Sequence, residues 1–279
     1  MSSLKLKRHE TFYIREGWFQ KAINTIKETD SNIFFKNNGV EYLGIGSNMV
    51  KSLKYWLRAA NIIDGQDNNL SEFGELLYKY DRYLDDVFSW FFIHYFLTIN
   101  KEDCPVFFEI MDSNYSAFDK ETIVEYLYNR FLLIDKNVNK KYIEADVNIF
   151  LQSYVCESKY KDPEDNLICS LSRLKLFKKD KNNYISLRPS YSSLSYLIIY
   201  YALYCKYDGK AFNIEDSMTD SMTPVKIFNL DKYMYLQYLD DARNDGLITI
   251  NRTAGLNTVY FEKELCLNDI FSEKFGGNK

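Results

Sequence analysis

Six polar side chains between residues 47 and 58 share one face of a predicted helix, and their types suit contact with a phosphate backbone. They are Ser47, Asn48, Lys51, Lys54, Tyr55 and Arg58. Lysine and arginine neutralise phosphate charges and release counterions, and an asparagine near a helix start could bond a base edge in the major groove. No acidic residue lies between Tyr42 and Ile63, although the whole chain has a net charge of −4. The ordinary alternative is a solvated helix surface.

The helix that carries this face is predicted over residues 47–61. Its other side presents apolar residues at three-and-four spacing, which indicates one buried face. These residues are Met49, Val50, Leu53, Trp56, Leu57 and Ala60. Gly44 and Gly46 predict a tight turn before the helix, with Ser47 as its N-cap.

Further elements flank this helix on both sides. Two helices are predicted before it, over residues 15–28 and 33–43. A short strand and turn over residues 62–67 follow it and lead into a helix capped by Ser71. Three helices followed by a small β-wing is the order of a winged helix-turn-helix. The sequence therefore predicts such a domain over residues 1–80, and this domain would be the DNA-binding one.

A similar order of elements is predicted in a second domain, residues 161–279. Helices over 192–205, 214–219 and 231–245 precede two strands, over 247–253 and 257–262. The last of these helices would repel phosphates, because it carries four acidic residues against two basic ones: Asp231, Asp240, Asp241 and Asp245 against Lys232 and Arg243. We therefore expect it to bind a protein partner through Tyr233, Tyr235 and Tyr238. The alternative is that these tyrosines belong to the core.

Between the two domains, residues 81–160 predict a helical connector. The segment from Val87 is apolar on nearly every side, which is typical of a central buried helix, and amphipathic helices follow over 119–134 and 140–156. Charged residues around Pro163, over 159–166, indicate a hinge. Residues 174–189 predict a β-hairpin that turns through 180–183. The fold class is thus mainly α with a minor β part.

Charge and cysteine usage narrow the class of protein further. Residues 1–80 hold 11 Lys and Arg against 9 Asp and Glu, whereas the remainder holds 24 against 30. A contact with DNA would therefore be local and sensitive to salt. The five cysteines, at positions 104, 156, 169, 205 and 266, are scattered and never form a C-x-x-C pair. This pattern indicates reduced thiols and a cytoplasmic protein, and no apolar segment is long enough to predict a membrane span.

Two chemical motifs are present only in part. Gly44 and Gly46 lack the third glycine of a dinucleotide fingerprint. Asp146 with Glu157 and Lys159 has the residue types of a metal-dependent nuclease site. The residues between them have helical rather than strand periodicity, so chance explains this pattern better.

The residues His9, Arg15, Asp86 and His94 could converge in a catalytic pocket. His94, however, lies on the apolar helix, where a hydrogen-bonded core histidine is the more common case. We therefore expect no catalytic residues, no metal site and no cofactor.

Three motifs stand out in the first third of the chain. They occupy residues 9–18, HETFYIREGW, residues 43–56, LGIGSNMVKSLKYW, and residues 81–94, DRYLDDVFSWFFIH. Together they resemble a prokaryotic family catalogued as domain of unknown function 4007. Later in the chain, Cys169-Ser170-Leu171 stands where the family would have Cys-Pro-Leu. The resemblance implies a genome-defence setting, because members are often encoded beside sulfurtransferase-type enzymes of DNA phosphorothioate modification and beside associated ATPases.

Three hypotheses about function follow. The first is a non-enzymatic DNA-binding accessory or regulatory protein of a defence system. Its partners would be double-stranded DNA and sulfurtransferase or ATPase subunits, and a homodimer is compatible with it. The second is a scaffold subunit whose winged helices bind proteins rather than DNA. The third is an enzyme built on the four residues named above.

Overall fold

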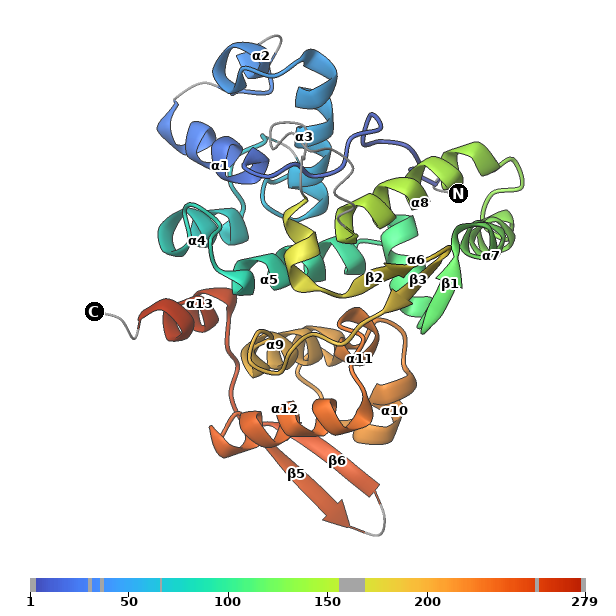
Figure 1. Ribbon diagram of the computed structural model, residues 1–279. Helices are drawn as coiled ribbons and strands as arrows, with labels where there is room; N and C mark the ends of the chain where they lie inside the picture. Colours follow the sequence, from blue (N-terminus) through green and yellow to red (C-terminus); the bar gives the residue numbers. More distant parts are fainter. Residues whose placement is uncertain are drawn as a thin grey trace. The chain divides into compact units, whose positions relative to one another are not determined.

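The computed structural model describes residues 4–29, 32–35, 38–65, 67–155, 169–253 and 256–276 and is mainly helical, as predicted (Figure 1). The chain divides into two compact units. The first comprises Met1–Ile110 and Tyr115–Leu187, and the second comprises Met111–Asn114 and Arg188–Lys279. Each unit is described below by itself.

The first unit begins with the helices predicted around the polar face. They are α1 (Trp18–Glu28), α2 (Asn38–Leu43), α3 (Ser47–Ala59) and α4 (Glu72–Tyr80). The Ser71 hydroxyl accepts a hydrogen bond from the Gly74 amide, so Ser71 caps α4 as expected. Between α3 and α4 a single antiparallel bridge joins Ile63 to Leu70, where the sequence predicts a small wing.

Helix α5 (Val87–Ile99) is the central helix of this unit. Every residue from Phe88 to Thr98 is buried, which confirms the expectation of a helix enclosed on all sides. The ring of Phe96 lies 4.8 Å from that of Phe73 on α4, and the ring of Trp90 stacks 6.0 Å from that of Phe19 on α1. Helix α5 therefore shares its core with the helices before it, and no domain boundary falls at residues 80–81.

The segment predicted as a helical connector, residues 81–160, also contains a strand. Helix α6 (Pro105–Ser113) and strand β1 (Ala117–Asp119) precede α7 (Lys120–Leu132) and α8 (Lys140–Tyr154). A short 3₁₀ helix, η1 (Ser170–Leu174), then leads to the predicted hairpin of β2 (Phe177–Asp180) and β3 (Asn183–Ser186). Strand β1 pairs with β3, which gives the order β1-β3-β2. This pairing joins segments on both sides of the predicted 160–161 boundary, and the predicted hinge, residues 159–166, lies outside the described residues.

The second unit also contains a short strand, then helices, then a β-hairpin. It contains α9 (Tyr196–Tyr207), β4 (Phe212–Asn213), α10 (Ile214–Thr219), α11 (Pro224–Ile227), α12 (Lys232–Asn244), β5 (Ile248–Thr253), β6 (Leu256–Phe261) and α13 (Leu267–Gly276). The three predicted helices and the two predicted strands are present, although α9 starts at Tyr196 because Ser195 caps it. The strand order is β4-β6-β5, so a first strand again pairs with the third. Figure 1 shows the hairpin of β5 and β6 extending away from α12.

Residues 111–114 belong to this second unit through Asp112. Its carboxylate accepts hydrogen bonds from the Lys226 ammonium and the Met222 amide, each at 3.0 Å. Burial alone would raise the pKa of Asp112, but the bonds from Lys226, Ser221 and Met222 outweigh burial and lower it. The carboxylate therefore stays charged and holds this segment against α11.

Gly74 is required where α4 meets the loop before it. An added Cβ would lie 2.2 Å from the carbonyl oxygen of Ile62, which is inside van der Waals contact. We expect Gly74→Ala to lower the free energy of unfolding by about 1–3 kcal/mol, as overpacking does. Urea unfolding followed by circular dichroism measures the change.

Gly65 is the matched control in the neighbouring loop, because no atom lies within 4 Å of its added Cβ. Gly65→Ala should change the free energy of unfolding by less than about 0.5 kcal/mol. Equal stability of the two variants would contradict the close approach at Gly74.

Candidate nucleic-acid interface

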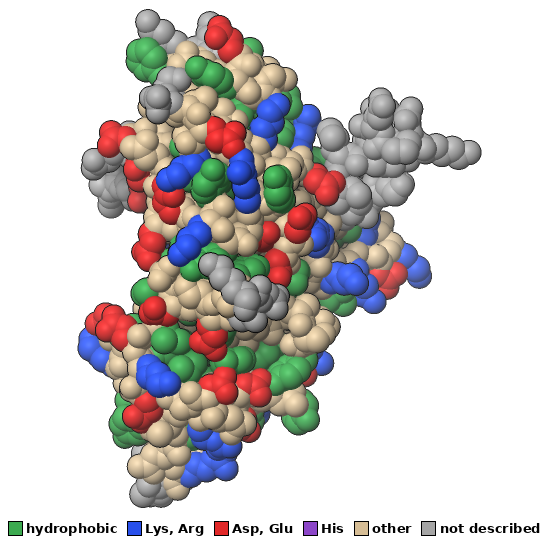
Figure 2. Space-filling view, turned by 90° about the vertical axis from the view of Figure 1, so that its left-hand side faces the viewer, with side chains coloured by type: hydrophobic (Ala, Val, Ile, Leu, Met, Phe, Trp, Pro, Cys, Tyr) green, Lys and Arg blue, Asp and Glu red, His purple; other side chains and the backbone are tan. Residues whose placement is uncertain are grey.

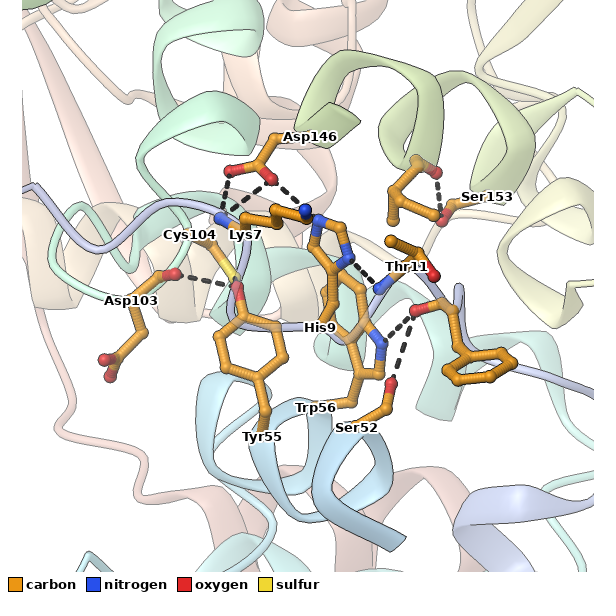
Figure 3. Close-up of polar contacts among 12 residues, drawn as sticks. Lys7, His9, Thr11, Ser52, Tyr55, Trp56, Asp103, Cys104, Asp146 and Ser153 are labelled. Atoms are coloured by element: carbon orange, nitrogen blue, oxygen red, sulfur yellow. Dashed lines mark hydrogen bonds and ion pairs between the residues drawn. The ribbon is translucent and has the colours of Figure 1, made fainter. Parts of the chain in front are cut away.

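The chain segment before α1 packs on both α3 and α8 through buried hydrogen bonds (Figure 3). The Asp146 carboxylate on α8 accepts the Lys7 amide at 3.0 and 3.1 Å and contacts His9 Nε2 at 2.7 Å. The Thr11 amide donates to His9 Nδ1 at 3.1 Å. Because an amide can only donate, Nδ1 is the acceptor and Nε2 carries the proton given to Asp146. His9 therefore acts as a connector between this segment and α8.

Helix α3 is fixed by the same segment through its C-terminal half. The Trp56 indole Nε1 donates to the Phe12 carbonyl at 2.9 Å, and the Ser52 hydroxyl donates to the same oxygen at 3.4 Å. The His9 ring stacks on Trp56 at 6.0 Å with an interplanar angle of 10°. Figure 3 shows Ser52, Tyr55 and Trp56 of α3 gathered beneath the crossing segment. This half of α3 is consequently held on several sides.

Tyr55, one of the six predicted DNA-contacting residues, points into the protein. Its hydroxyl donates to the Asp103 carbonyl at 2.7 Å and lies 3.3 Å from the Cys104 sulfur. Burial raises the pKa of Tyr55 well above its ordinary value and that of the Cys104 thiol to about 12. The polar face is thus narrower than the sequence predicts, because the spacing of a helix does not show which polar residue has a buried partner.

Arg58 is also engaged within the fold. One terminal nitrogen of its guanidinium donates to the Gly65 carbonyl at 3.0 Å and to the Asn68 side chain at 2.7 Å. These bonds hold the loop between α3 and α4. The half-buried Lys54 places its ammonium 5.6 Å from the Phe34 ring centre, and burial, followed by the charge of Arg58, lowers the pKa of Lys54.

Ser47, Asn48 and Lys51 remain exposed at the start of α3. The N-cap residue of α3 is Gly46, which supplies no side-chain cap to the first helical turn. The N-terminal end of a helix carries partial positive charge, so it favours anions such as phosphate. The arrangement can therefore bind a phosphate group and present Asn48 beside it.

The predicted partner-binding tyrosines of the second unit fall into two classes. Tyr233 is 72% exposed, whereas Tyr235 and Tyr238 are fully buried, so these two are core residues and the prediction is corrected for them. The Tyr235 hydroxyl lies 2.7 Å from that of Ser217, and the Tyr238 ring stacks 4.9 Å from that of Tyr191. The helical spacing of α12 places positions 235, 238 and 239 on one side of the helix. The alternative interpretation, that the tyrosines belong to the core, therefore applies to Tyr235 and Tyr238.

The acidic residues of α12 have partners in the same unit. The Asp231 carboxylate caps the helix through the Met234 amide and lies 3.0 Å from Arg188. The Asp241 and Asp245 carboxylates accept hydrogen bonds from the Tyr191 and Tyr196 hydroxyls respectively. These acids therefore help to hold the unit together as well as giving α12 its negative charge.

The four residues considered for a catalytic pocket have separate partners. His9 contacts Asp146, and the Arg15 guanidinium lies over the Phe12 and Trp18 rings. The Asp86 carboxylate caps α5 through the Phe88 amide, and His94 Nδ1 lies 2.6 Å from the Tyr154 hydroxyl. Among the described residues no group of three His, Cys, Asp or Glu side chains could hold a metal ion. The geometry thus gives no support to a shared site of these four residues.

A hollow lined by lysines lies elsewhere in the first unit, and the sequence reasoning did not identify it. Its volume is about 650 Å³. The lining residues are Tyr154, Val155, Ser172, Lys175, Phe177, Lys178, Lys179, Lys181 and Leu187. The only sequence signal is the run of lysines in the predicted hairpin, which ordinary surface charge explains equally well.

Positive and negative side chains are intermingled on the face of the molecule that Figure 2 shows. A broad surface of one charge is not visible on that face. Within the described ranges, no helix combines the length and apolar character needed to cross a membrane.

The fold and these surfaces define a mainly helical protein of two units with basic side chains exposed at specific elements. The family model "Protein of unknown function (DUF4007)" matches residues 6–274, so the chain belongs to this family. The resemblance found in the sequence motifs is thereby confirmed.

Two solved structures are similar to this chain. One, described as a magnesium ion-bound SspB crystal structure, has a TM-score of 0.83 and 21% identity, over 99% of this chain and 88% of that chain. The other, described as an SspB crystal structure, has a TM-score of 0.82 and 20% identity over the same shares. At such identity the likeness shows a common fold. No curated protein matches the sequence.

Proposed function

We propose that this protein is a non-enzymatic accessory or regulatory subunit that binds duplex DNA through the exposed start of α3. The observation that carries the proposal is the exposure of Ser47, Asn48 and Lys51 on a helix with no acidic residue. Such a helix end can accept a backbone phosphate while a neighbouring side chain reaches the base edges. The family resemblance favours a place in a genome-defence or DNA phosphorothioate modification system.

The order of elements supports a winged helix-turn-helix reading of this region. Helices α1, α2 and α3 come first, and the bridge between Ile63 and Leu70 stands where a wing follows the recognition helix. In that reading α3 is the helix that enters the major groove. The bonds from Arg58 to the loop after α3 would hold the wing in place.

Rigid support of α3 also favours recognition by this helix. A DNA-reading side chain must be held in register, because base contacts depend on fixed distances and angles. The hydrogen bonds of Trp56 and Tyr55 fix the C-terminal half of α3 and leave its first turn free to meet a ligand. The exposed turn is therefore both accessible and positioned.

The proposal is tested by Lys51→Glu in the full-length protein. We expect the affinity for a duplex of about 20 base pairs to fall about tenfold or more, and the slope of log K against log salt to decrease by about 0.9, because one phosphate contact is lost. Fluorescence anisotropy at several salt concentrations measures both quantities. Plain and phosphorothioate duplexes serve as probes, with magnesium or with EDTA, because one similar structure is described as magnesium ion-bound.

Lys206→Glu is the matched control, since Lys206 is exposed on α9 of the second unit and the change in net charge is the same. It should bind DNA like the wild type. If Lys51→Glu also binds like the wild type, the assignment to α3 is refuted. If the wild type binds no duplex at low salt, where electrostatic binding is strongest, the scaffold hypothesis takes its place.

A further inference from the structure

The hairpin of β2 and β3 has an unusual charge for a protein with excess acid. It carries Lys178, Lys179 and Lys181 against the single acid Asp180, and Lys175 comes just before it. All four lysines are exposed and line the hollow of about 650 Å³. Positive charge is thus concentrated along one wall of a surface depression.

The ion pairing of these lysines differs from that of other lysines in the first unit. Among the described residues, no carboxylate pairs with Lys175, Lys178 or Lys181, whereas Lys27 and Lys140 each form an ion pair on the same unit. Lys179 places its ammonium 5.8 Å from the Tyr184 ring centre. Lysines without a carboxylate in the fold attract an anion from outside it.

The chemistry of the hollow selects phosphate over bases. Its aromatic residues Tyr154 and Phe177 are 2% and 5% exposed, so neither ring face is open for stacking. Tyr154 is further occupied by its contact with His94. Lysine is a flexible point charge that binds phosphate without reading sequence. The hollow therefore suits a phosphate group, which in the proposed DNA complex is supplied by the sugar-phosphate backbone.

The topology places this hairpin where a wing would be. In the first unit, the hairpin of β2 and β3 follows strand β1 and helices α7 and α8. The second unit has the same order of elements, in which the hairpin of β5 and β6 follows strand β4 and helices α10 to α12. Helix α8 occupies the position of a recognition helix, but its Asp146 is engaged by His9 and the Lys7 amide. More than half of the residues of α8 are buried, whereas Lys178 and Lys181 of the hairpin are exposed, so the hairpin offers the more accessible contact. The second hairpin, in contrast, carries only Arg252 as a charged residue.

We propose that the β2–β3 hairpin is a second DNA contact, in which Lys178 and Lys181 bind backbone phosphates at the lysine-lined hollow. This proposal rests on the proposed function, DNA binding, and adds a site on a different element. Contacts of this kind strengthen binding to all sequences equally, while α3 would supply any preference among them.

The test is a salt titration of DNA binding by full-length Lys178→Ala/Lys181→Ala. Loss of two phosphate contacts should reduce the slope of log K against log salt by about 1.8. The loss of affinity should be the same for duplexes of different sequence. Unchanged circular dichroism and thermal melting show that the variant is folded, which is expected because both side chains are exposed.

Lys206→Ala/Arg252→Ala is the control, since it removes the same charge from exposed positions of the second unit. It should retain the wild-type slope. An equal loss of slope in this control, or an unchanged slope in the hairpin variant, would overturn the hairpin contact.

The outcomes also separate the two proposals. A normal slope in the hairpin variant combined with weak binding by Lys51→Glu leaves the α3 site standing alone. The reverse result assigns the DNA contact to the hairpin and refutes α3. A wild type that binds no DNA at low salt refutes both.

Discussion

Replacing Trp56 by alanine is expected to lower the free energy of unfolding by about 3–5 kcal/mol, the range for truncating a large core aromatic residue. Trp56 is fully buried, and its ring contacts His9, Tyr55 and Phe107. The substitution also removes the indole donor to the Phe12 carbonyl. Urea unfolding measured by circular dichroism gives the change.

Trp56→Phe separates the two contributions, because it keeps an aromatic ring and loses only the donor and part of the volume. It should cost clearly less than the alanine variant. Tyr233→Ala, at an exposed position, should change the stability by less than about 0.5 kcal/mol. A loss below about 1 kcal/mol in Trp56→Ala would contradict the tight packing of α3.

The second large effect is unfolding in alkali. The hydrogen bond to Asp241 raises the pKa of Tyr191 to about 12, and burial raises that of Tyr200 to about 12. Burial also raises the pKa of the core residues Tyr235 and Tyr238. The folded state thus binds these protons more tightly than the unfolded state, whose tyrosines have a pKa of about 10. The stability is fully present below about pH 10 and is lost as the pH rises toward 12.

The size of the alkaline destabilisation follows from adding the pKa shifts of several tyrosines. A shift of one pKa unit corresponds to about 1.4 kcal/mol, and a folded protein typically has about 5–15 kcal/mol in total. Because Tyr191 is 41% exposed and solvent screens its interaction, we expect the buried residues Tyr200, Tyr235 and Tyr238 to supply most of the destabilisation of the second unit. Tyrosinate absorbance and helical circular dichroism should therefore change together between about pH 10 and pH 12.

Tyr238→Phe is an informative variant because the Tyr238 hydroxyl makes only a long contact, 3.4 Å, with the Tyr191 carbonyl. Its stability at neutral pH should be nearly that of the wild type. Its alkaline midpoint should be higher, because one buried ionisable group is gone. Titration of all tyrosines near pH 10 with intact helices would contradict the prediction.

The sequence predicts helices most accurately in long segments with periodic apolar residues. The apolar stretch after Val87 and the amphipathic pattern after Ser47 predict α5 and α3 within two residues of their observed ends. Side-chain periodicity is strong evidence for a helix, because one buried face must repeat every three or four residues. The hairpin of β2 and β3 was also predicted, since its turn residues are typical.

Strands β1 and β4 were missed for a physical reason. They contain three and two residues, and each is defined by pairing with a hairpin far along the chain. Such strands have no local pattern of their own. The same long-range pairing moved the unit boundaries away from the predicted ones, because β1 and β3 belong to one sheet.

The candidate site was predictable only in part. Charge and spacing single out Lys51 and Asn48, whose side chains are exposed, but they could not distinguish an exposed polar residue from Tyr55, whose partners are about 48 residues away. Tyr235 and Tyr238 differ from Tyr233 only by their position on the helix face. That Lys178 and Lys181 form no ion pair with any described residue could be seen only from the fold, because ion pairing depends on neighbours in space.

The bonds between the first residues and α8 set an order of events during synthesis. Lys7 and His9 are made early, but their partner Asp146 follows about 139 residues later. At roughly 5–20 residues per second, the ribosome needs about 7 to 28 seconds to reach it. The partners of Tyr55, residues 103 and 104, are made before Asp146, so α3 gains its contacts in two steps. Helix α3 therefore reaches its full set of supporting contacts only after about half of the chain has been made.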